Sequence, residues 1–106
     1  MSWISPVNTS PETPNTDTIL YVVPPDKQFT SSSLVVCNLR DTPSEFSISI
    51  RGSSDDEEGF YIYFEHPVRH TFIATIGMTL GTGNAIFVSG DTTDLSFTLF
   101  GVEQAG

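Results

Sequence analysis

The sequence predicts an all-β fold, a single β-sandwich of jelly-roll type with seven to eight short antiparallel strands and an extended N-terminal arm. Three observations carry this prediction. Strand-forming segments alternate with turn residues at spacings of about 8–12 residues. Ser and Thr are abundant, whereas alanine is scarce and lysine occurs once. No segment of useful length shows the period of a helix.

Three of the expected strands follow one another in the first half of the chain. Ile19–Val23 is an apolar strand that ends at two prolines, and Gln28–Leu39 is a strand with a continuous apolar centre that includes Cys37. Because such a run is typical of a buried strand, Cys37 is predicted to be a buried small hydrophobic residue. After a turn at Asp41–Pro43, Phe46–Arg51 alternates apolar with polar residues, which predicts one core face and one outer face.

Four further strands are expected in the second half, with short turns between them. They are Phe60–Glu65, Thr71–Leu80, Ala85–Ser89 and Leu95–Glu103. Before them, four consecutive acidic residues, Asp55–Glu58, predict a solvated loop because like charges repel and flanking glycines break strands. A plain acidic run lacks the alternating oxygen ligands of a calcium loop, so no calcium site is predicted there.

The charge balance excludes several classes of partner. The net charge is −9, and the four basic residues are Lys27, Arg40, Arg51 and Arg69. Four scattered cations form no basic patch, so neither nucleic acid nor an anionic membrane surface is an expected partner. No apolar run is long enough to span a membrane. One cysteine excludes an intrachain disulfide and a cysteine-cluster zinc site.

Residue types that could perform catalysis occur in unsuitable arrangements. His66 and His70 have the spacing that would place two imidazoles on one face of a helix, but Pro67 separates them and both flanks predict strands. Side chains four residues apart on a strand lie about 13 Å apart, so a polar turn is expected here, with no metal site. No general acid–base pair stands out. We therefore expect a protein that is not an enzyme and needs no cofactor.

The first sixteen residues differ in composition from the rest. Three prolines and several Ser, Thr and Asn residues predict an extended arm over residues 1–16, followed by the β-sandwich domain over residues 17–106. The arm carries the only tryptophan of the chain, and we expect Trp3, Ile4 and Val7 to anchor it in a pocket of the same chain or of a neighbour. The alternative is a flexible tail whose tryptophan folds back on its own domain.

The aromatic strand Phe60–Glu65 cannot hide all its large side chains in a two-layer sandwich. Either its even-numbered apolar residues or Tyr61 and Tyr63 point inward, and the other set faces outward. The same argument applies to Ala85–Val88. Apolar residues on outer faces favour a subunit contact, with Tyr61 and Tyr63 as its candidates. Cover by the chain's own loops or arm is the alternative.

The order of these motifs also points to a family. Tyr21–Asn38 combines a Val-Pro turn, a lysine, paired serines and the ending Val-Val-Cys-Asn, and a short turn and the Phe46–Ile50 strand follow. Thr71–Leu80, Ala85–Ser89 and the final strand from Leu95 follow in the same order as in that family. Together these segments resemble small β-rich virion proteins of tailed bacteriophages. The sequence departs from the family at Pro24–Asp26, where the family tends to have Pro-Ala-Gly, and at the acidic loop. The arm lies outside the resemblance.

The resemblance implies a structural role in a phage particle that is assembled in the cytoplasm of a bacterial host. The first expectation is a capsid decoration or cement protein that binds the major capsid protein or other virion proteins, as a homo-oligomer such as a trimer. A second is a tail, baseplate, or fibre or adaptor component. The residues leave a third possibility open, a small carbohydrate-binding β-sandwich that stacks sugars on Tyr61, Tyr63 or Trp3.

Overall fold

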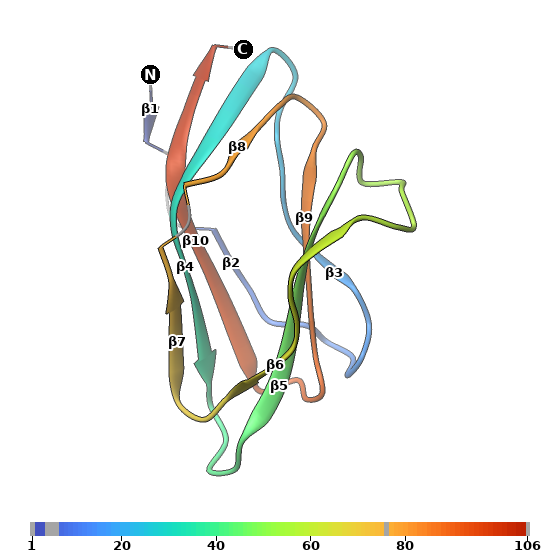
Figure 1. The fold of residues 1–106 in the computed structure, drawn as a ribbon, viewed down its shortest axis with the longest axis vertical. Coiled ribbons are helices and arrows are strands. Elements are labelled where there is room, and N and C mark those ends of the chain that lie inside the picture. The colour runs from blue at the N-terminus through green and yellow to red at the C-terminus, as the bar shows by residue number, and fades with distance from the viewer. Residues whose placement is uncertain (1, 4–6, 76, 106) are drawn as a thin grey trace.

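The computed structural model describes residues 2–3, 7–75 and 77–105, the first two by their backbone alone. These residues form ten β-strands (Figure 1). The strands are β1 (Ser2–Trp3), β2 (Val7–Thr9), β3 (Thr18–Val22), β4 (Lys27–Asn38), β5 (Ser44–Arg51), β6 (Phe60–Val68), β7 (Thr71–Ala74), β8 (Thr79–Leu80), β9 (Ala85–Gly90) and β10 (Leu95–Ala105). In the described part of the chain there is no helix with the length and apolar character needed to cross a membrane.

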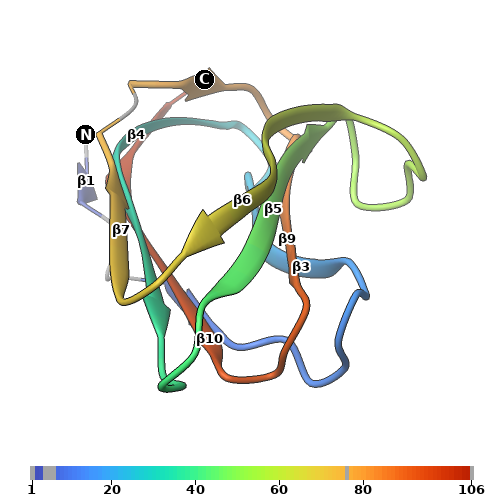
Figure 2. The same ribbon diagram turned by 60° about the horizontal axis from the view of Figure 1, so that its bottom comes forward.

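The strands form two antiparallel sheets that pack face to face (Figures 1 and 2). Sheet A has the order β1-β10-β4-β7, with β2 also paired to β10 and β8 also paired to β4. Sheet B has the order β3-β9-β5-β6. Because β1 and β2 lie one after the other along β10, and β7 and β8 along β4, the ten strands fill eight positions.

The strand pairing is that of a jelly roll, a long hairpin folded over on itself. Counted from the chain ends inward, β1 and β2 pair with β10, β3 with β9, β4 with β7 and β8, and β5 with β6. Successive pairs alternate between the two sheets, as a jelly roll requires. The predicted all-β sandwich of jelly-roll type is therefore confirmed. The acidic loop between β5 and β6 is the tip of the folded hairpin, and it projects from the molecule in Figure 1.

The core lies between the inner faces of the two sheets. Phe29, Phe46 and Phe97 are its largest side chains, and each is at most 1% exposed. The predicted alternation of β5 is confirmed on its inner face, where Ile48 is also buried. The prediction for Cys37 is wrong, because this residue is only half-buried. Its neighbours on β4 point inward, and strict alternation in a two-layer sandwich leaves the odd residues of that run on the outer face.

A bulge in β4 interrupts the strand that was expected over Thr71–Leu80. Gly101 of β10 pairs with Ser31 whereas Phe100 pairs with Ser33, so Ser32 is an extra residue on β4. Opposite the bulge, the expected single strand is divided into β7 and β8. Backbone hydrogen bonds there are replaced in part by the Ser31 hydroxyl, which accepts the Met78 amide at 3.0 Å.

Within the expected arm, residues 2–3 and 7–9 lie in sheet A. Both β1 and β2 pair with β10, and the half-buried Val7 packs against the core. The Asn8 amide donates hydrogen bonds of 2.8 Å to the hydroxyls of Ser96 and Thr98. Pro11 is fully buried. An edge of β10 that would otherwise be open is thus covered by β1 and β2.

Candidate partner-binding site

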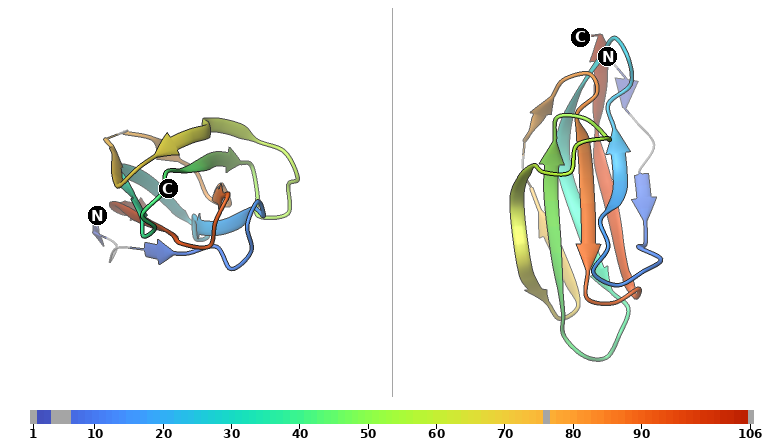
Figure 3. Two further views of the ribbon diagram at one scale, coloured as in Figure 1. Left: turned by 90° about the horizontal axis from the view of Figure 1, so that it is seen from below. Right: turned by 90° about the vertical axis from the view of Figure 1, so that its right-hand side faces the viewer.

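The outer face of sheet B carries a groove of about 350 Å³. Its floor is formed by β5 and β9, which lie at the centre of the sheet in the right-hand view of Figure 3. We call it the outer groove. The residues that line it are Asn15, Asp17, Glu45, Phe46, Ser47, Tyr61, Phe64, Glu65, Ser89, Gly90 and Asp91. The floor side chains are small, because Ser47 and Ser89 occupy the outer positions of their strands.

A bulge in β6 builds one wall of the outer groove. Phe46 pairs with His66 and Ile48 pairs with Tyr63, so two residues of β6, Phe64 and Glu65, lie opposite Ser47 alone. Glu65 takes a positive φ of 47°, and its amide donates to the Ser47 hydroxyl at 2.9 Å. Because of this extra residue, Phe64 is turned away from the core.

The wall presents an exposed aromatic pair. Tyr61 is 53% exposed and Phe64 is 61% exposed. Their ring centroids are 4.9 Å apart with an interplanar angle of 73°, an edge-to-face contact. Large apolar side chains gathered on an edge strand are typical of a surface that contacts another molecule. Strand β6 is such an edge, because within the described residues it pairs with β5 alone.

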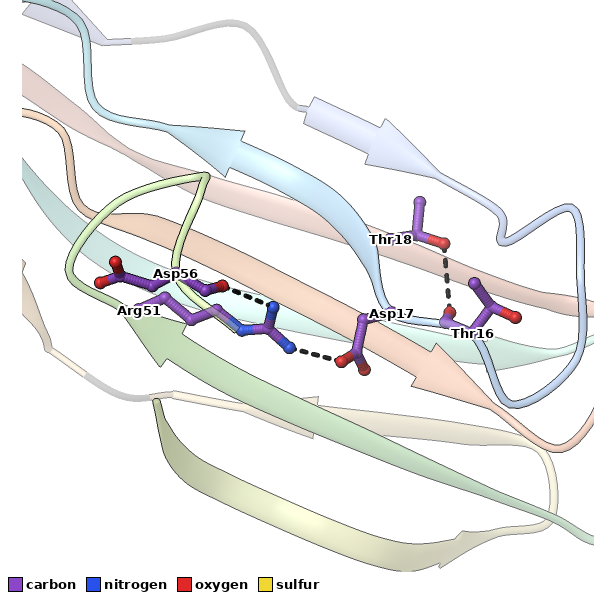
Figure 4. Close-up of polar contacts among 5 residues, drawn as sticks. All are labelled: Thr16, Asp17, Thr18, Arg51 and Asp56. Carbon is purple, nitrogen blue, oxygen red and sulfur yellow. Dashed lines mark hydrogen bonds and ion pairs between the residues drawn. The ribbon is translucent and has the colours of Figure 1, made fainter. Parts of the chain in front are cut away.

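Arg51 binds both the side of the outer groove opposite β6 and the loop at the tip of the hairpin (Figure 4). Its side chain is 9% exposed and forms an ion pair with Asp17, which lines the outer groove. It also donates to the backbone carbonyl of Asp56 in the acidic loop at 2.9 Å. The guanidinium carbon lies 3.8 Å from the centre of the Phe87 ring. One cation therefore ties the loop, the outer face and the segment before β3 together.

This arrangement explains how an aromatic residue on the outer face is buried. Phe87 faces outward from β9, opposite Ser49, yet it is only 6% exposed because Arg51 lies over its ring. The expected alternation in Ala85–Val88 is present. Its apolar outer residues, however, are covered by the chain's own elements, which is the alternative stated for this segment.

The outer groove is acidic. Glu45, Glu65 and Asp91 line it with exposed side chains, whereas Asp17 is already paired with Arg51. No lysine or arginine is among the described residues that line it. A smaller hollow beside it, also bordered by Tyr61, adds Glu57 and Glu58 from the acidic loop together with Arg51. Acidic side chains therefore outnumber basic ones around the aromatic pair.

The structure places the predicted anchor residues of the arm only in part. Val7 is half-buried against the core and pairs with Leu99. The backbone of Trp3 pairs with Val102. Ile4 lies outside the described residues. The role of these three residues in binding a partner stays a prediction.

The two candidate tyrosines of the subunit contact differ in environment. Tyr61 is exposed on the outer groove, as described above. Tyr63 is half-buried and packs against the core, with its ring 5.9 Å from that of Phe46 and 5.1 Å from that of Phe72. They do not form one surface, because a second register shift at Ile62 breaks the alternation that would have placed them on the same face. Phe64 shares the surface of Tyr61 instead.

The two histidines and the acidic loop, which the sequence offered as possible metal ligands, lie in separate environments. His66 lies within β6 and stacks against Phe46 and Phe72, whereas His70 lies in the turn before β7. The acidic residues of Asp55–Glu58 are exposed, as predicted. Among the described residues, no group of three His, Cys, Asp or Glu side chains could hold a metal ion.

Sequence reasoning overlooked Ser47, Phe64 and Arg51 as parts of one site. A usable signal was present in Arg51, a cation at the outer end of an alternating strand directly before an acidic loop. Comparison with known proteins adds nothing to these residues, because no family model matches the chain and no curated protein is significantly similar to it.

Proposed function

We propose that this chain is a structural protein of a tailed-phage virion, and that it decorates the capsid by binding the shell of the major capsid protein. Its place would then be the virion, assembled in the cytoplasm of a bacterial host. The order of motifs from Tyr21 to Glu103 and the jelly-roll fold support this proposal. The observation that carries it is the exposed pair Tyr61 and Phe64 on edge strand β6.

The proposed mechanism is burial of surface without chemistry. Removing apolar area from water is favourable by about 25 cal/mol per Å², and part of this gain is offset by the freedom lost on binding. A protein that binds only the assembled shell stabilises that shell by mass action. In this role the domain would bind across joints between capsomers, as a homo-oligomer such as a trimer, and the aromatic pair would supply apolar contact.

The test is a count of copies in purified particles. Occupancy on the order of hundreds of copies per particle is expected for a shell protein, because it follows the symmetry of the capsid. About six to a few dozen copies would place the protein in the tail, baseplate or fibre. Absence from particles would contradict both. The double variant Tyr61→Ser/Phe64→Ser should reduce occupancy, while the matched variant Leu39→Ser/Ile73→Ser, at exposed apolar sites elsewhere, should not.

A second candidate is a carbohydrate-binding module. It is favoured by one observation, the presence of Tyr61 beside serine hydroxyls and carboxylates in the outer groove. An exposed aromatic ring can stack on a sugar face while polar groups bind its hydroxyls. Retention of the protein by a specific glycan, lost in Tyr61→Ala, would support this function over the architectural one.

A further inference from the structure

We propose that the outer groove is a docking site for an extended segment of a partner protein that carries arginine side chains. This inference rests on the proposed function, because it names the chemistry of the protein surface that the chain would bind. Three features of the groove support it: an aromatic wall, an unpaired negative charge, and an arginine already bound in the same manner on the same face.

The aromatic wall suits a planar cation. Tyr61 and Phe64 meet edge to face, so the pair does not stack its ring faces against each other. A guanidinium group binds favourably over such a face, and binds more strongly when water is excluded. The floor residues Ser47 and Ser89 are small, which leaves room for a long side chain between the wall and the segment before β3.

The charge of the groove selects a cationic occupant. Glu45, Glu65 and Asp91 border it, and no basic side chain among its described lining residues compensates them. A neutral occupant such as a sugar would remove water from these carboxylates without returning an opposite charge. An arginine would pair with them, in the bidentate geometry that its guanidinium favours.

Arg51 shows that this face of the sheet binds arginine. Its guanidinium lies over the ring of Phe87, pairs with Asp17 and donates to the backbone carbonyl of Asp56, so an aromatic ring and a carboxylate are two of its three partners. Tyr61 or Phe64 together with Glu45 or Glu65 offers the same combination on the other side of the groove. Within the chain that second combination is not filled by a basic residue that lines the groove.

The partner is expected to bind through side chains and not as an added strand. The free edge of β6 contains Pro67, which has no amide hydrogen, and the bulge at Glu65 with its positive φ. Both features are devices by which edge strands avoid pairing with other strands. Recognition by arginine side chains in the groove is compatible with such a protected edge.

The experiment is a titration of the full-length, ¹⁵N-labelled protein with a short synthetic peptide of alternating arginine and serine, followed by NMR. We expect shift changes that cluster at the outer groove, including Ser47 and Ser89, and an affinity that falls as salt increases. A peptide with citrulline in place of arginine has nearly the same shape without the charge. It should bind about tenfold more weakly or not at all.

Matched variants separate groove binding from general attraction to an acidic protein. Glu45→Gln/Glu65→Gln should weaken binding of the arginine peptide by about five- to tenfold. Asp26→Asn/Asp41→Asn makes the same change in net charge at exposed sites that do not line the groove, and should have little effect. Phe64→Ala should weaken binding, whereas Ile73→Ala on sheet A should not.

The inference would be overturned by no binding of the arginine peptide, by equal binding of the citrulline peptide, or by equal weakening in the two charge variants. Shift changes in the groove with a β-linked glucose hexamer, without a response to the arginine peptide, would also overturn it in favour of sugar binding. Normal particle occupancy of Glu45→Gln/Glu65→Gln would refute the inference and leave the proposed function intact. If the protein binds the peptide in the groove but is absent from particles, the proposed function is refuted and the arginine-binding groove is retained.

Discussion

Asn38, at the end of β4, connects two turns through a single side chain. The two hydrogens of its amide nitrogen, one of them shared between two acceptors, point to the backbone carbonyls of Thr42, Val68 and Arg69 at N–O distances of 2.8, 3.1 and 3.2 Å. Its amide oxygen accepts the backbone amide of Arg40 at 3.0 Å. The residue is 9% exposed, so these bonds are shielded from water. The turn after β4 and the turn between β6 and β7 are therefore held to each other by one amide group.

Removal of this amide should destabilise the whole domain. We expect Asn38→Ala to lower the free energy of unfolding by about 2–4 kcal/mol, because it leaves several polar backbone groups without partners. Asn38→Asp keeps the size and the acceptor but loses the donor, and should cost a similar amount. Urea denaturation would measure both. An Asn38→Asp protein as stable as the parent would show that the three carbonyls do not need this donor.

Tyr21 links the two sheets and should make stability fall at alkaline pH. Its hydroxyl donates a hydrogen bond to the carboxylate of Glu103, from β3 in sheet B to β10 in sheet A. Burial raises the pKa of Tyr21, and the hydrogen bond to Glu103 and its charge raise the pKa further. In the unfolded chain the pKa is about 10. Above that pH the unfolded state loses the proton that the folded state keeps, so unfolding becomes more favourable.

The corresponding test compares the parent with Tyr21→Phe. The stability that the hydroxyl contributes should be fully present below about pH 10 and should decline as the pH rises towards the folded-state pKa. The difference in unfolding free energy between the two proteins should therefore shrink as the pH rises above about 10. A constant difference up to the alkaline limit of measurement would contradict the raised pKa of Tyr21.

The bulge in β4 depends on a glycine in the strand beside it. Because Ser32 is an extra residue, the side chains of β4 that point into the core are odd-numbered before the bulge and even-numbered after it. Phe29 thereby points into the core, and its ring lies over Gly101 of β10. A Cβ atom at Gly101 would be 2.3 Å from that ring and 2.6 Å from the carbonyl oxygen of Thr30. Only glycine leaves room for this packing.

Gly101→Ala should be among the most damaging small substitutions in the chain. Phe29 is fully buried, so its ring cannot move aside without disturbing the core. We expect a loss of about 3 kcal/mol or more in unfolding free energy. Gly77→Ala is the matched control, since nothing lies within 4 Å of a Cβ atom there. It should change stability by less than about 0.5 kcal/mol. Equal effects would show that space at Gly101 is not the deciding factor.

The bulges in β4 and β6 also mark where the alternation of residues along a strand fails to predict which side chains face the core. Alternation in β5 predicted its inner face correctly, because that strand lies inside sheet B and keeps its register with β9 throughout. The same reasoning for β6 offered two alternating sets, and neither is present. Its alternation breaks at Ile62 and again at Phe64 and Glu65. A bulge changes which residues face the core without altering the local composition, so no period in the sequence reveals it.

For the whole molecule, the fold class could be predicted but the assembly of the site could not. Turn residues at Pro24–Lys27 and Asp41–Pro43 separate strands that occur as expected. The outer groove, in contrast, brings together Asp17, Ser47, Phe64 and Asp91 from four distant segments. These residues lie close together because the long hairpin folds over on itself, and the pairing of segments far apart in the sequence leaves no local pattern. For the same reason composition alone assigned residues 1–16 to a separate arm, whereas residues 2–3 and 7–9 of this segment are paired with the last strand of the chain.

That pairing leads to a prediction for the molecule as a whole. Deletion of residues 1–10 removes both strands that cover the edge of β10, together with Val7 and the Asn8 side chain that binds Ser96 and Thr98. We expect unfolding free energy to fall by about 2–4 kcal/mol. The uncovered edge of a long strand should also promote pairing between copies. Urea denaturation and sedimentation velocity would measure the two effects.

The point variant Asn8→Ala separates these effects, because it removes the two side-chain hydrogen bonds but leaves the backbone of β2 in place. It should lower stability by about 1 kcal/mol and leave the sedimenting mass equal to that of the full-length protein. A shortened chain that matches the parent in both stability and mass would mean that the first ten residues are a dispensable arm after all. A shortened chain that is less stable and forms larger species would show that the jelly roll needs its first strand to close sheet A.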